Sequence, residues 1–166
     1  MYKRQTLYVA DEGAGDNTYA NGSYTAAAAS TTAGLQKWVY NSANGEWQLA
    51  YTLQAGLNLG APYTVPGYPA GINSVTGLPW APATGGLRNI TGRVNPDGSV
   101  TIWATTSTVS GSGDQGADPN RLVSVADDLN ATTLPASEAF RTVVPAAYDQ
   151  VVRGVSVTPG TDEHGR

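Results

Sequence analysis

Alternation of apolar and polar side chains at every second position is the feature that most limits what this 166-residue chain can fold into. A period of two is typical of strands that bury one face, and runs with a helical period are almost absent. Turns rich in glycine, proline and asparagine separate the alternating runs. We therefore predict an all-β fold, with strands at residues 6–11, 35–41, 46–54, 87–94, 100–108, 121–128, 140–144 and 151–158.

Two stretches of the chain lack this alternation. Residues 13–33 are mostly small and polar and include four consecutive alanines at 26–29. We expect a loop there, because no apolar partner follows the alanines at helical spacing. Residues 55–86 hold five prolines and many glycines, which predicts a long connection without a central strand.

One short phrase occurs twice in the chain. Residues 87–91 (LRNIT) and 152–156 (VRGVS) both read hydrophobic, arginine, small, hydrophobic, hydroxyl. If this phrase opens a unit of four strands, A to D, the whole chain reads B-C-D, A-B-C-D, A. The turn sequence at 95–99 then places 100–106 between 87–94 and 121–128, antiparallel to both.

A series of four-stranded antiparallel units is the pattern of a β-propeller. With its LYVADEG, GEWQLAYTL, TIWATT, NRLVSVADD and VVRGVSVTPG segments, the region 6–160 resembles secreted bacterial β-propeller repeat proteins of the YVTN/WD40-like group. The resemblance implies a partial propeller of about two blades, since a closed ring takes about 4–8 blades. It also implies that the remaining blades of a longer chain, or further copies of this chain, are partners, and it carries over no catalytic residue. The alternation alone leaves a second fold open, a two-layer β-sandwich of the same strands.

The two ends of the chain differ from the rest. Residues 2–5 (YKRQ) resemble the translation of a transposase sequencing adapter, so we expect residues 1–5 to be a non-native leader. Residues 161–166 are expected to be a polar tail, and this tail holds His164, the one histidine of the chain. Many small polar residues with few lysines and glutamates favour an extracellular or periplasmic protein whose export signal lies outside this sequence.

Composition removes several classes of function. With no cysteine and one histidine, zinc–thiolate sites, disulfides and Ser-His-Asp triads are excluded. The net charge is −4 and basic residues do not cluster, which argues against nucleic-acid binding. No apolar run is long enough for a membrane-spanning helix. The sequence therefore favours a non-enzymatic binding or structural module for a protein or glycan ligand. The alternative is a fragment of a calcium-dependent propeller hydrolase of the lactonase or phytase kind.

Two acidic loops are the candidate metal sites. Each follows a strand B and is rich in glycine, and their carboxylates are the oxygen ligands that Ca²⁺ prefers: Asp11, Glu12, Asp16, Asp114 and Asp118. The same residue types are also common turn formers, and neither loop has the spacing of an EF-hand. Calcium is the one cofactor that the sequence suggests.

Two arginines are the candidate ligand residues. Arg88 and Arg153 hold the same position of the repeated phrase. The propeller resemblance would place them along the central channel, where a guanidinium can attract an anion. Their repetition equally fits a structural role in each unit.

Aromatic side chains divide into two groups. Alternation predicts that those in strands pack between the units: Trp38, Tyr40, Trp47, Tyr51 and Trp103. Those on the proline-rich connection, Tyr63, Tyr68 and Trp80, are expected to fix this loop to the core, with stacking on a sugar ring as the alternative.

Overall fold

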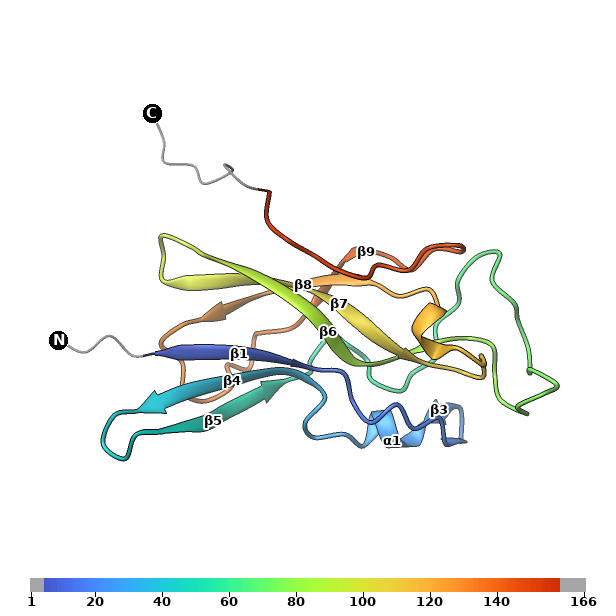
Figure 1. Ribbon diagram of the computed structural model, residues 1–166, viewed down its shortest axis with the longest axis horizontal. Helices are drawn as coiled ribbons and strands as arrows, with labels where there is room; N and C mark the ends of the chain where they lie inside the picture. Colours follow the sequence, from blue (N-terminus) through green and yellow to red (C-terminus); the bar gives the residue numbers. More distant parts are fainter. Residues whose placement is uncertain (1–4, 159–166) are drawn as a thin grey trace.

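A computed structural model describes residues 5–158, and these residues form two antiparallel sheets (Figure 1). The first sheet has the order β1 (Thr6–Asp11), β4 (Gly34–Asn41), β5 (Glu46–Leu53). The second has the order β6 (Ala83–Val94), β7 (Ser99–Val109), β8 (Leu122–Asp128), β9 (Arg141–Val144). Apart from Gln5, the expected leader and the polar tail lie outside the described residues.

Both sheets are meanders in which each strand pairs with the next one along its unit. The central prediction for the second sheet is confirmed, because β7 lies between β6 and β8 and is antiparallel to both. The first sheet has the three strands expected of a B-C-D unit, in that order. The fold is therefore all-β, and its sheets remain open rather than closed into a ring.

Residues 151–158 do not form the strand that the repeated phrase predicts. Instead, the backbone N–H and C=O of Val152 bond the side-chain amide of Asn120 at 2.7 and 2.9 Å. Alternation determines which side chains share a face, but a strand also needs a partner, and β9 already pairs with the other edge of β8. The repeat therefore predicts β6 correctly and is wrong for its second occurrence.

The stretch between β1 and β4 also differs from the predicted loop. It contains a short hairpin, β2 (Tyr19–Ala20) and β3 (Ser23–Tyr24), followed by one helical turn, α1 (Thr25–Ala28). Ala27 packs with Tyr24, Ala83 and Val109 in a small apolar cluster, so tertiary contacts stabilise this turn. A second short helix, η1 (Gln115–Ala117), follows β7.

The main core lies between the two sheets. Leu35 and Leu53 on the first sheet join one cluster with residues of the second sheet, among them Ile102, Val123 and Val125. Full burial of each such side chain contributes about 1.5–3 kcal/mol. The sheets therefore pack face to face, and in this article the inner face of each sheet is the one that lines this core.

The end of β1 crosses β6 at very short range. A Cβ on Gly86 would lie 2.3 Å from the carbonyl oxygen of Asp11, so only glycine fits there. Next to it, the hydroxyl of Ser107 donates to the carbonyl of Glu12 at 2.7 Å. This crossing fixes the acidic loop after β1 against the second sheet.

The proline-rich connection is held by its tyrosines, as predicted. Tyr63 donates to the carbonyl of Pro119 at 2.8 Å, and the Arg121 guanidinium lies 3.8 Å from the Tyr63 ring centre. Tyr68 donates to Asp118 at 2.7 Å. Within the described part of the chain, neither length nor apolar character would let any helix cross a membrane.

Candidate functional site

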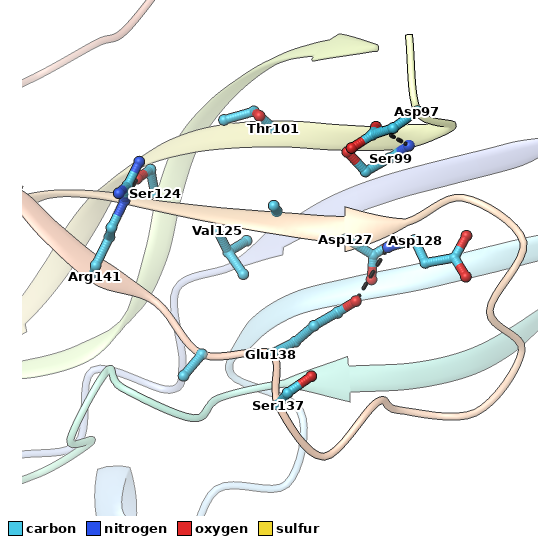
Figure 2. A pocket seen from close by; sticks show the side chains of 12 residues that line it. Asp97, Ser99, Thr101, Ser124, Val125, Asp127, Asp128, Ser137, Glu138 and Arg141 are labelled. Atoms are coloured by element: carbon cyan, nitrogen blue, oxygen red, sulfur yellow. Dashed lines mark hydrogen bonds between the residues drawn. The ribbon is translucent and has the colours of Figure 1, made fainter. Parts of the chain in front are cut away.

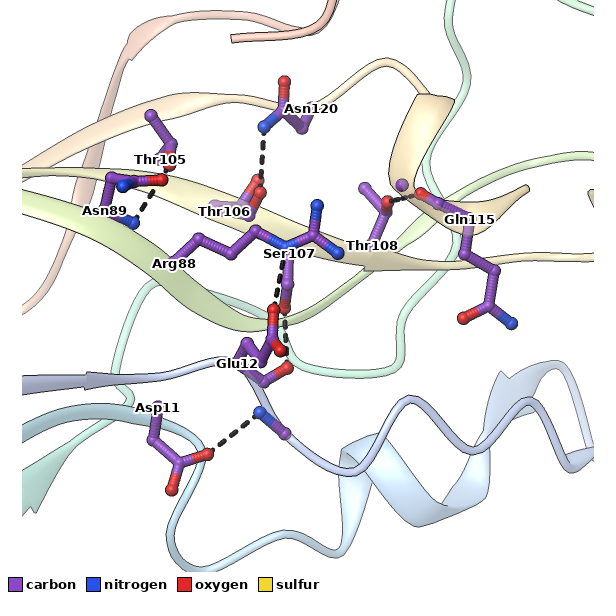
Figure 3. A network of polar contacts seen from close by, with 12 residues as sticks. Asp11, Glu12, Arg88, Asn89, Thr105, Thr106, Ser107, Thr108, Gln115 and Asn120 are labelled. Carbon is purple, nitrogen blue, oxygen red and sulfur yellow. Dashed lines mark hydrogen bonds and ion pairs between the residues drawn. The ribbon is translucent and has the colours of Figure 1, made fainter. Parts of the chain in front are cut away.

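The acidic loop after β1 is occupied by local contacts (Figure 3). Asp11 accepts from the N–H of Gly13 at 2.9 Å, and Asp16 accepts from the N–H of Thr18 at 2.7 Å. Glu12 pairs with Arg88 of β6 at 2.9 Å, with both side chains well exposed. An exposed pair of this kind contributes about 0–1 kcal/mol. These carboxylates therefore act first as turn formers and as a partner for Arg88.

The loop after β7 also uses its carboxylates internally. Asp114 accepts from the N–H of Gly116 at 3.1 Å and begins η1. Asp118 is buried and accepts from Ser110 at 2.6 Å as well as from Tyr68. Burial raises the pKa of Asp118, while the hydrogen bonds to its carboxylate act in the opposite direction.

The structure does not gather the predicted metal residues into one site. Among residues 5–158, no three His, Cys, Asp or Glu side chains lie together as a metal-binding group. Calcium binding at either loop stays a prediction. The two arginines do not occupy matching places, because Arg88 lies on β6 and Arg153 is exposed outside any strand.

The most unusual feature of the inner faces is a buried ion pair that joins the two sheets. Lys37 of β4 and Asp127 of β8 approach to 2.7 Å, and both side chains are fully buried. Lys37 also donates to Tyr51 at 3.0 Å and to the carbonyl of Asp128. Its ammonium group lies 5.8 Å from the ring centre of Tyr8. A buried charge persists only with such partners, because desolvation of each ion costs several kcal/mol.

Asp127 is the centre of this polar cluster. It accepts hydrogen bonds from Lys37, from Tyr51 and from Tyr8, so every strand of the first sheet contacts it. Burial alone would raise the pKa of Asp127, but these hydrogen bonds outweigh burial and hold the pKa below its usual range. Burial and the facing carboxylate raise the pKa of both phenols well above the ordinary value.

Beside the ion pair, a hollow opens between the end of β8 and the segment that leads into β9 (Figure 2). Its volume is about 570 Å³, and its polar lining includes Ser99, Thr101, Asp128, Glu138 and Arg141. Glu138 accepts from the N–H of Asp128 at 3.1 Å. Burial and the nearby Asp127 raise the pKa of Glu138 to about 7.

The sequence does contain a signal for this cluster. Lys37 shares the alternating face of Leu35 and Val39, and Asp127 shares the face of Val123 and Val125. Opposite charges on the apolar faces of two strands predict a pair across the core. Glu138 has no comparable signal, because it lies in an irregular segment whose path depends on tertiary contacts.

The outer face of the first sheet carries a row of apolar side chains from all three strands. Cross-strand neighbours Leu7, Trp38 and Leu49 form one line, and Tyr40 pairs with Trp47. Leu7, Trp47 and Leu49 remain 45%, 41% and 46% exposed. Of the strand aromatics predicted to lie between the units, Tyr51 is the one on the face that packs against the second sheet; Trp38, Tyr40 and Trp47 lie on the outer face. We call the following residues the apolar outer face: Leu7, Val9, Trp38, Tyr40, Trp47 and Leu49.

Comparison with protein-family models, with curated protein sequences and with solved structures found no match to this chain. The functional argument therefore depends on the geometry described above.

Proposed function

We propose that this chain is a non-enzymatic binding or structural module whose two sheets are neighbouring blades of a larger β-propeller. The observation that carries this proposal is the apolar outer face of the first sheet. Soluble proteins rarely leave a contiguous apolar patch in water, and such a patch is typical of an interaction surface. The outer face of the second sheet is more polar, with Thr91, Thr101 and Ser124 among its residues.

The shape of the apolar outer face favours another β-sheet as its partner. The side chains stand in cross-strand rows on a three-stranded sheet, and two such sheets pack about 10 Å apart. The inner face of the same sheet already packs in this way. The rings of Tyr40 and Trp47 meet edge to face, with centres 5.5 Å apart and an interplanar angle of 62°. They do not present the flat, coplanar surface on which a sugar ring stacks, so a protein partner fits better than a glycan.

The strand order supports the propeller as the larger architecture. The first sheet has the B-C-D order and the second the A-B-C-D order that two successive units would have. We propose that the sheet covering the apolar outer face is another unit of this type, from a longer chain or from a further copy. The small polar composition supports a location outside the cytoplasm, in the periplasm or beyond the cell.

Self-association of the isolated chain tests this proposal. A double variant, Leu7→Lys with Leu49→Lys, places two charges on the apolar outer face. We expect concentration-dependent association of the unmodified chain, measured by light scattering, and loss of this association in the variant. The matched control is Val75→Lys with Val94→Lys, because these valines are 90% and 63% exposed and lie off this face. Equal association of both variants, or a monomeric unmodified chain at all concentrations, would overturn the proposal.

A further inference from the structure

Glu138 occupies a position that an ionised carboxylate fits poorly. One oxygen, Oε1, accepts from the backbone N–H of Asp128 at 3.1 Å. The other, Oε2, is buried, and no described residue offers it a donor. The side chain that faces Glu138 is Asp127, whose own oxygens already accept from Lys37, Tyr51 and Tyr8. Two carboxylates can form a hydrogen bond only if one of them carries a proton.

The surrounding charges decide which carboxylate carries that proton. From the first sheet, the Lys37 ammonium and the phenols of Tyr8 and Tyr51 all point to Asp127 and stabilise its ionised form. From the second sheet, Asp127 and Asp128 lie beside Glu138, while Arg141 and Asp97 lie further along the lining of the hollow. Arg141 donates to Ser124 at 3.2 Å. The negative charge beside Glu138 is thus closer to it than to any cation that it could pair with itself, which leaves the proton on Glu138.

We propose that Glu138 is a proton-dependent latch: as a neutral acid it donates a hydrogen bond to Asp127 and holds residues 129–140 against the buried ion pair, and on ionisation it releases them. The proton goes to solvent, and no covalent bond changes. The segment is otherwise anchored at its end, where the N–H of Phe140 donates to the carbonyl of Ala55 at 2.8 Å. Release would therefore open the hollow at Glu138 and let water reach Asp127, while the core cluster around Phe140 stays packed.

The pKa of about 7 for Glu138, above the ordinary 4.5, gives the direction of the effect. The folded state binds one more proton than the unfolded state between these two values. The latch therefore contributes fully below pH 4.5, weakens as the pH rises toward 7, and is lost above that value. This inference does not depend on what the apolar outer face binds.

Hydrogen exchange at the Asp128 amide tests the latch, because this N–H is the one that Glu138 accepts. We expect its protection factor, after correction for the intrinsic exchange rate, to fall by about tenfold per pH unit above pH 7, since one proton is released on opening. In Glu138→Gln the side-chain amide reproduces the neutral acid, with a donor for Asp127 and an acceptor for Asp128. We expect its protection factor to stay constant over the same range.

The matched control is Glu46→Gln, which neutralises an exposed glutamate in a turn of the first sheet and should follow the unmodified chain. A protection factor that is independent of pH in the unmodified chain would overturn the proposal, as would the same decline in Glu138→Gln. A carbon NMR titration of the Glu138 carboxyl in the unmodified chain gives a second test that needs no variant. A midpoint near 7 supports the latch, and a midpoint near 4.5 contradicts it.

Discussion

The two faces of the first sheet reverse the usual distribution of charge. Its inner face holds Lys37, a fully buried charge, and its outer face holds Leu7, Trp47 and Leu49 largely in water. On the inner face, Asp127, Tyr51 and Tyr8 satisfy the charge from both sheets. On the outer face, no described residue covers the apolar row to a comparable degree. The difference indicates that the inner contact is complete, whereas the outer face has the chemistry of a surface that another element covers.

Removal of Asp127 should break this comparison most strongly. In Asp127→Ala the Lys37 ammonium stays buried without its counter-ion, so we expect a loss of about 3–5 kcal/mol in the free energy of unfolding. Urea denaturation measures this loss. Leu49→Ala on the opposite face of the same sheet is the matched control and should change stability by about 1 kcal/mol or less, since Leu49 is already 46% exposed. Similar losses in both variants would show that the two faces do not differ as described.

A double variant sharpens the meaning of this loss. Lys37→Met with Asp127→Leu removes both charges and keeps a similar volume. Replacement of a buried ion pair by apolar residues is often neutral or stabilising by about 1–4 kcal/mol. We expect the double variant to recover most of the stability lost in Asp127→Ala. A double variant as unstable as the single one would mean that the tyrosine hydrogen bonds, rather than the pair, stabilise this region.

The acid limb of stability provides a smaller test on the unmodified chain. Because the pKa of Asp127 lies below its unfolded value of 3.8, its contribution is fully present above pH 3.8 and is lost as the pH falls through the lower folded value. We expect stability to decline in this range, by at most about 1.4 kcal/mol per pH unit from this group. Denaturation curves between pH 2 and 5 measure the decline. The double variant of Lys37 and Asp127 should show a shallower one, and an equal slope would exclude Asp127 as its source.

Much of this fold follows from local sequence. Alternation and the turns at 43–45 and 95–99 predict the strands of both sheets and the order within each sheet. The repeated phrase fails at 151–158 because an alternating segment needs a free edge, and the sequence does not show that β9 and Asn120 take the contacts near β8. The acidic residues were identified by type alone, and type does not distinguish a turn former such as Asp16 from a ligand.

The candidate site was less predictable than the fold. The pairing of Lys37 with Asp127 depends on which faces of two distant strands meet, although the phase of each residue on an apolar face gives a clue. The aromatic residues of β4 and β5 were expected between the units, but the inner face of β4 belongs to Leu35 and Lys37 instead. Alternation shows that Trp38 and Tyr40 share a face and does not show which face meets the second sheet.

The central claim is that the apolar outer face is the surface through which this chain packs against another sheet. Fluorine NMR of the chain labelled with 5-fluorotryptophan tests it most directly, because the four tryptophans divide between this face and the rest of the molecule. We predict that the signals of Trp38 and Trp47 shift or broaden as the protein concentration rises, while those of Trp80 and Trp103 do not. Changes confined to Trp80 and Trp103, or no change in any of the four, would contradict the claim.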